Sequence, residues 1–126
     1  MGIDFQAMTT NLGDGVARVA VAGEADLFTA PELKEALANA VDGGAHDVIV
    51  DLSDATFIDS TTLGVLIGTV RRLRPLGGTV AIACHDANIV RIFEITRLDQ
   101  VFPIFETADE GLAFLRDPER TRGSAG

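Results

Sequence analysis

Residues 57–64, FIDSTTLG, hold the densest group of side chains that could do chemistry. Asp59 supplies a carboxylate, and Ser60, Thr61 and Thr62 supply three consecutive hydroxyls. An apolar run precedes this group and an apolar helical pattern follows it, so the group lies where a strand gives way to a helix. Hydroxyls at such a junction have two uses: they cap the helix, or they accept a phosphoryl group.

Ser60 therefore has two interpretations. As the N-cap of the helix, its hydroxyl accepts a hydrogen bond from a free backbone N–H, which is worth about 1 kcal/mol. As a phosphorylation site, it holds a phosphate at the positive end of the helix dipole. The phosphate adds a charge of about −1.5 to −2 beside Asp59 and repels a partner that docks there. The residue pattern alone leaves both interpretations open.

Other residues that could carry chemistry are isolated. Asp51, at the end of a predicted strand, suggests a receiver domain, but a receiver needs a late lysine and the only lysine is Lys34. A single cysteine, Cys84, excludes a disulfide framework, and His46 and His85 are too few for most histidine-rich zinc sites. The chain also has no glycine-rich phosphate loop and no Ser/His/Asp set with suitable spacing. We predict no enzyme, no metal and no cofactor.

Length and charge narrow the possible functions further. The chain has 126 residues, with 10 Lys+Arg against 19 Asp+Glu and a net charge of −9. Such a surface repels nucleic-acid backbones and anionic membranes. No window approaches 18 consecutive apolar residues, and the first residues are acidic where a signal peptide is basic. We expect a soluble cytoplasmic protein with no direct nucleic-acid partner and no membrane association.

Hydrophobic periodicity predicts which elements position these residues. We expect strands over 3–8, 16–21, 47–52, 79–83 and 101–105, the first two forming a hairpin. Helices are expected from Thr29, over 60–74, from Asp86 and from Thr107. Segment 53–59 is expected to be a connection with Phe57 and Ile58 buried.

Capping boxes, in which the cap and the third helical residue bond each other's backbone, are expected at 29–32 and 107–110. Strands that alternate with helices imply an α/β (α+β-like) fold with a mixed sheet of four or five strands. We expect about four helices, packed mainly on one side of the sheet. Residues 1–117 form one domain, and the polar segment 118–126 is expected to be a disordered tail.

Three motifs in register resemble one known family. Residues 59–66, DSTTLGVL, are similar to the D-S-[ST]-G-L-G-V motif of anti-sigma factor antagonists, which are STAS domains. Residues 23–26, GEAD, match the family's G-E-[IL]-D. Gly77-Gly78 and residues 91–98, RIFEITRL, match its G-G and R-[LI]-F-[DE]-[IM]-[ST]-G-L signatures. The resemblance covers residues 3–115.

This resemblance implies the STAS fold and a partner-switching regulator. In that family the unphosphorylated antagonist binds an anti-sigma factor that is also a Ser/Thr kinase, and this frees a sigma factor. The kinase phosphorylates the serine after the aspartate, here Ser60, and a PP2C-type phosphatase restores binding. The residues that the resemblance assigns to the partner surface are Glu24, Asp26, Asp59, Ser60, Thr61, Thr62 and Gly64.

The sequence departs from the family pattern at three positions. Thr62 replaces a glycine, and its β-branched side chain could obstruct a partner's approach. Ala25 replaces a larger aliphatic residue, and Arg97 replaces the glycine before Leu98. A second reading stays open, in which the chain is a sensing or transport-accessory STAS domain that is never phosphorylated. Ser60 would then be a helix cap only.

Overall fold

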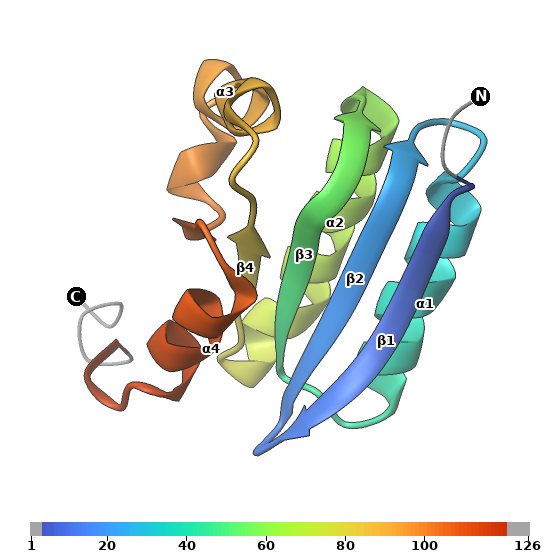
Figure 1. The fold of residues 1–126 in the computed structure, drawn as a ribbon. Helices are drawn as coiled ribbons and strands as arrows, with labels where there is room; N and C mark the ends of the chain where they lie inside the picture. Colours follow the sequence, from blue (N-terminus) through green and yellow to red (C-terminus); the bar gives the residue numbers. More distant parts are fainter. Residues whose placement is uncertain (1–3, 121–126) are drawn as a thin grey trace.

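Strands and helices alternate along the chain in the computed structural model, which describes residues 4–120 (Figure 1). The order of elements is the predicted one. In chain order they are β1 (Gln6–Gly13), β2 (Val16–Ala25), α1 (Ala30–Asp42), β3 (Asp47–Ile58), α2 (Ser60–Leu73), β4 (Val80–Ala83), α3 (Ala87–Ile95), β5 (Ile104–Phe105) and α4 (Ala108–Arg116). Short 3-10 turns, Arg74–Leu76 and Leu98–Gln100, follow α2 and α3.

The five strands form one mixed sheet in the order β1-β2-β3-β4-β5. β1 and β2 form the predicted antiparallel hairpin, and the other neighbours are parallel. Each parallel connection passes through at least one helix, as crossovers between parallel strands require. The carboxyl ends of β2 and β3 therefore lie at the same end of the sheet as the amino end of α2, where the predicted site lies (Figure 1).

Helices cover the two faces of the sheet unequally, as predicted. The larger core lies between the sheet and α1, α2 and α3, and includes Leu37, Val50, Leu66 and Phe93. On the opposite face α4 packs over β3, β4 and β5 through a smaller cluster that includes Leu115. The front of β1 and β2 in Figure 1 carries no helix of the described chain. This fold is the predicted α/β arrangement, with five strands where four or five were expected.

Strand β3 is longer than predicted, and the prediction for segment 53–59 was wrong. That segment continues to pair with β2, so that Glu24 lies opposite Phe57 and Ala25 opposite Ile58. Ile58 is buried as expected, but Phe57 is 47% exposed. The strand was not predicted over residues 53–56 because most of these residues are polar. They are polar because this part of the sheet is largely exposed. Strand β1 also runs further than predicted, to Gly13, while β5 is limited to two residues.

The two predicted capping boxes had different outcomes. Thr107 and Glu110 form one at the start of α4, each side chain bonding the other's backbone. The box at Thr29 is absent, because that hydroxyl is used elsewhere. It donates to the Glu24 carbonyl (2.9 Å) and accepts from the Asp26 N–H (2.8 Å). Thr29 therefore closes the β2–α1 loop rather than capping α1.

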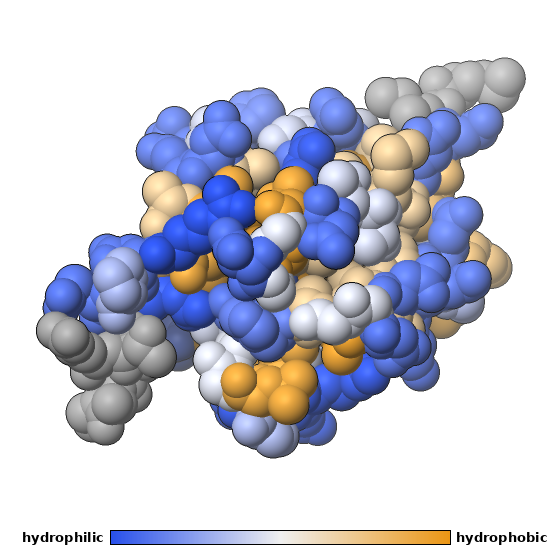
Figure 2. All heavy atoms as spheres, turned by 90° about the horizontal axis from the view of Figure 1, so that it is seen from below, coloured by the Kyte–Doolittle hydropathy of each residue, from blue (hydrophilic) through white to orange (hydrophobic). Residues whose placement is uncertain are grey.

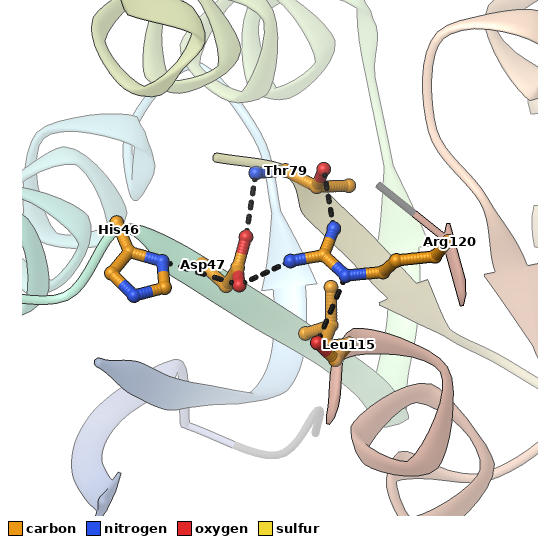
Figure 3. A network of polar contacts seen from close by, with 5 residues as sticks. All are labelled: His46, Asp47, Thr79, Leu115 and Arg120. Carbon is orange, nitrogen blue, oxygen red and sulfur yellow. Dashed lines mark hydrogen bonds and ion pairs between the residues drawn. The ribbon is translucent and has the colours of Figure 1, made fainter. Parts of the chain in front are cut away.

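Arg120 holds the segment after α4 against the domain. This residue lies within 118–126, the range expected to be a disordered tail. Its guanidinium lies 2.6 Å from the carboxylate of Asp47, which is 1% exposed, and donates to Thr79 and to the Leu115 carbonyl (Figure 3). Asp47 also accepts from the Thr79 N–H, and His46 Nδ1 lies 3.2 Å from the carboxylate. The contacts of the described chain thus extend past residue 117. Residues 121–126 of the expected tail lie outside the described residues.

Candidate functional site

Asp59 joins helix α2 to the β2–α1 loop. It stands at the N-cap, where Oδ1 accepts from the Thr62 N–H (3.0 Å). Its other oxygen, Oδ2, accepts from the Leu27 N–H of the loop (3.1 Å), and its own N–H donates to the Ala25 carbonyl (3.2 Å). One carboxylate therefore caps the helix and holds the loop against it. A carboxylate also suits the positive end of the helix dipole.

Ser60 is exposed at the start of α2, as predicted, but it is not the cap. Ser60 is the first residue of the helix. The sequence pattern favoured Ser60 as the N-cap, but Asp59 occupies that position. Aspartate and serine are comparable N-caps, so their order in the sequence could not decide between them. The Ser60 hydroxyl is therefore not needed to cap α2.

The neighbouring residues of the predicted partner surface differ in exposure. Thr61 is half-buried, and Gly64, one turn further along α2, is exposed, with no atom within 4 Å of where a Cβ would stand. A partner's backbone could approach closely there. Thr62 is 0% exposed, and so is turned away from any partner. The expectation that its side chain could obstruct docking was wrong. Ala25, another departure from the family pattern, is also buried.

The β2–α1 loop places Glu24 and Asp26 at the same end of the sheet. Glu24 is exposed at the end of β2. Asp26 is half-buried, and its Oδ1 accepts from the N–H groups of Phe28 (2.9 Å) and Thr29 (3.1 Å). The Asp26 carboxylate thus shapes the loop, which lies against the start of α2. The structure brings the residues of the two motifs together, although 32 positions separate Leu27 from Asp59.

Three exposed apolar residues at this end of the sheet were not among the predicted site residues. Leu27 is 62% exposed and Phe28 88% exposed in the loop, and Phe57 is exposed at the end of β3. Figure 2 shows the opposite end of the molecule, where apolar residues lie in separate areas among hydrophilic ones. Leu27 and Phe28 are adjacent in the chain, and neighbouring exposed apolar residues are typical of protein-binding surfaces. The signal in the sequence was the Leu-Phe pair directly after Asp26 in a loop, where solubility alone favours polar residues.

The remaining reactive groups have structural surroundings. The pKa of Asp51 lies below its usual value, because hydrogen bonds from Ser53 and Arg18 outweigh the opposing effect of burial. Burial raises the pKa of the Cys84 thiol, which keeps it protonated at neutral pH. Within residues 4–120 no cluster of three or more metal-binding side chains occurs. No helix of that range has the length and hydropathy to cross a bilayer.

Comparison with known proteins identifies the family. The STAS domain profile matches residues 7–111. The chain belongs to the STAS domain family. An anti-sigma-B factor antagonist of Staphylococcus epidermidis is 37% identical over 106 residues, covering 84% of this chain and 95% of that one. The anti-sigma-B factor antagonist of Bacillus subtilis is 34% identical over 95 residues, covering 75% of this chain and 86% of that one.

A solved structure of the same kind agrees with the fold. The crystal structure of an anti-sigma factor antagonist from Mycobacterium paratuberculosis superposes with a TM-score of 0.76 at 31% identity, covering 90% of this chain and 96% of that one. The STAS fold and the family predicted from three short motifs are therefore confirmed. This match extends over most of both chains, so the shared unit is the whole STAS domain.

Proposed function

We propose that this STAS domain is an anti-sigma factor antagonist whose Ser60 is a phosphorylation switch. The unphosphorylated form binds an anti-sigma factor kinase and frees a sigma factor, in the cytoplasm. The observation that carries the proposal is the exposed Ser60 hydroxyl beside the Asp59 N-cap, in a chain that resembles named antagonists over most of its length. The chain is then a ligand and a substrate rather than an enzyme.

Accessibility and charge support Ser60 as the acceptor. In the kinase step the Ser60 Oγ attacks the γ-phosphorus of ATP, its proton goes to a base of the kinase, and ADP leaves. The product is a phosphate beside the Asp59 carboxylate, which is already held by two backbone N–H donors. A carboxylate held in this way cannot turn aside without losing them. The charge of the phosphate on Ser60 therefore adds to that of a fixed Asp59 carboxylate, and both would face the partner.

The proposed partner surface has an acidic part and an apolar part. The acidic part is Glu24, Asp26 and Asp59, and the accessible helix positions are Ser60, Thr61 and Gly64. Leu27, Phe28 and Phe57 add the apolar part. Aromatic side chains that fill pockets of a partner supply much of the binding energy in interfaces, while charges direct association. A PP2C-type phosphatase would hydrolyse the phosphoserine ester and restore binding.

The test uses an anti-sigma factor kinase from the same organism, ATP, and variants of Ser60. We expect a mass increase of about 80 Da at Ser60 in the parent protein and none in Ser60→Ala, which still binds. Ser60→Asp should weaken binding by about 2–5 kcal/mol if the site is desolvated in the complex. The effect would be smaller if the single charge of aspartate is a poor substitute for the nearly double charge of phosphoserine. Thr61→Ala, the matched control, should be phosphorylated normally.

Two outcomes would contradict this proposal. One is phosphate localised by mass spectrometry to Thr61 or Thr62 with Ser60 unmodified. The other is a folded Ser60→Asp protein that binds the kinase as tightly as the parent does. Absence of phosphorylation together with absence of binding would favour the sensing or transport-accessory reading, in which Ser60 has no switching role.

A further inference from the structure

Thr62 makes a buried connection between two segments that are distant in the sequence. Its side chain is fully buried, and Oγ1 lies 2.7 Å from the Ala25 carbonyl and 3.2 Å from Asp59 Oδ1. A hydroxyl has one proton to donate, and the shorter contact assigns it to Ala25. The family motif has glycine at this position, which has no hydroxyl. This chain therefore has a tie between α2 and the end of β2, where the β2–α1 loop begins, that a glycine could not make.

The tie reinforces those made by Asp59. The Asp59 N–H donates to the same Ala25 carbonyl, and Asp59 Oδ2 accepts from the Leu27 N–H. Three hydrogen bonds thus join residues 25–27 to the start of α2. The Thr62 bond is shorter than the other two and is shielded from water. Without the Thr62 hydroxyl the Ala25 carbonyl would still accept from the Asp59 N–H, so the loss is that of one buried hydrogen bond.

The loop held in this way carries Leu27 and Phe28, the most exposed apolar side chains near Ser60. A mobile loop must be ordered when a partner binds, and this ordering reduces the affinity. A loop that is already fixed to α2 presents Phe28 in one position relative to Ser60. The partner that fits this arrangement has an apolar recess for an aromatic ring close to the surface that meets Ser60.

We propose that Thr62 is a positioning residue, whose hydroxyl holds the β2–α1 loop so that Phe28 is pre-arranged for the anti-sigma factor. This inference rests on the proposed function for the identity of the partner. The tie itself is a property of the free protein. The role of Thr62 is exerted through Phe28, since Thr62 has no exposed surface.

The test compares three variants of the free protein. Thr62→Val keeps the shape and removes the hydrogen bond, and Thr62→Ser restores a hydroxyl. Thr61→Val is the matched control, one position earlier and half-buried. Amide hydrogen exchange at Leu27 should be about fivefold faster in Thr62→Val, as expected for losing one buried hydrogen bond. Exchange in Thr62→Ser and Thr61→Val should stay close to that of the parent protein.

Affinity for the anti-sigma factor separates positioning from a general loss of structure. We expect Thr62→Val to bind about threefold to tenfold more weakly, with Thr62→Ser restoring most of the affinity. In a double-mutant cycle with Phe28→Ala, the effects of the two substitutions should not add, because Thr62 acts through Phe28. A loss of overall stability would weaken binding with or without Phe28.

The outcomes that overturn the proposal are distinct from failure of the proposed function. Unchanged exchange at Leu27 in Thr62→Val, or additive effects in the cycle, would show that Thr62 does not position the loop. In either case Ser60→Asp could still abolish binding, and the switch would stand. If instead Ser60→Asp bound normally, the proposed function would fail. The amide exchange rate at Leu27 in Thr62→Val would still show whether Thr62 holds the loop in the free protein.

Discussion

At the scale of single residues, Asp59 shows how one side chain can serve the fold and the proposed switch together. Its two oxygens accept from two backbone segments, the first turn of α2 and the β2–α1 loop. An asparagine or serine side chain has only one acceptor oxygen, so in this geometry it could replace only one of these two contacts. The negative charge that favours the helix end also lies where a phosphate on Ser60 would add to it. Fold stability and partner repulsion thus depend on the same carboxylate.

Asp51 is the residue for which pH dependence can be predicted. Its carboxylate accepts from Ser53 Oγ (2.6 Å) and Arg18 Nη2 (2.6 Å), and its pKa is lowered in the folded protein. A lowered pKa stabilises the folded state above the unfolded value of about 3.9, and this contribution is lost as pH falls through the folded pKa. Asp51→Asn should therefore destabilise the protein by about 1–3 kcal/mol at pH 7.

This difference from the parent protein should shrink as the pH falls below about 4, because the parent then loses the same interaction. Urea unfolding at a series of pH values measures it. Asp54→Asn, an exposed aspartate on the same strand, is the control and should change stability by less than about 0.5 kcal/mol. A destabilisation by Asp51→Asn that stayed constant down to pH 2 would contradict the prediction.

At the scale of elements, the end of α3 holds a conformation that its residue does not favour. Arg97 has φ 63°, in the left-handed region, and replaces the glycine of the family motif. A non-glycine residue there costs about 1–2 kcal/mol. Arg97→Gly should therefore stabilise the protein by about 1 kcal/mol, although glycine also makes the unfolded chain more flexible. Thermal or chemical unfolding measures the change.

An arginine-to-glycine substitution inside α3 should change the stability in the opposite direction. Arg91 is exposed within α3, so Arg91→Gly removes a good helix former and should destabilise the protein by about 1 kcal/mol. The pair of variants has the same chemistry and differs only in backbone conformation. If both variants destabilised equally, the strain assigned to Arg97 would be wrong.

How well the elements could be predicted from the sequence depended on whether local signals or tertiary contacts decide them. The start of α3 at Asp86 and the box at Thr107 follow from side chains that bond their own neighbours, and both predictions were confirmed. By contrast, the Thr29 hydroxyl bonds back to the end of β2, which a local pattern could not indicate.

The candidate site shows the same division. The motif at 59–66 located the exposed Ser60, but the cap and the burial of Thr62 depend on a loop more than 30 positions away. The far end of β3 was missed because its pairing with β2, rather than its own hydrophobicity, keeps it extended. Phe57 and Phe28 were missed as site residues because apolar residues are expected inside. Their exposure emerges only when the sheet ends are placed in space.

At the scale of the whole molecule, the proposed partner surface and the anchor of residues 117–120 at Asp47 lie at opposite ends of the sheet (Figure 1). Ser60 stands at the carboxyl ends of β2 and β3. Asp47, which binds Arg120, is the first residue of β3. Stability can therefore be changed at the Asp47 end with little direct effect on the partner surface. This separation permits a test of what holds the domain together without disturbing the proposed switch.

Arg120 should contribute more to stability than its place near the end of the chain suggests. Its guanidinium is the cation 2.6 Å from the buried Asp47 carboxylate, and it also bonds Thr79 Oγ1 and the Leu115 carbonyl. Removing one partner of a buried ion pair leaves an uncompensated charge, at a cost of about 3–5 kcal/mol when the site is fully dry. His46 and the Thr79 N–H remain near Asp47, so we expect about 2–3 kcal/mol for Arg120→Ala.

The matched control is Arg72→Ala, which removes an arginine whose ion pair with Asp42 is exposed on both sides. An exposed pair is worth about 0–1 kcal/mol, so this variant should be nearly as stable as the parent protein. Chemical unfolding of both variants gives the two differences. Binding of the folded Arg120→Ala protein to the anti-sigma factor should be unchanged, since the partner surface is at the other end. Equal stability of the two variants would mean that Arg120 does not anchor the segment after α4 in solution.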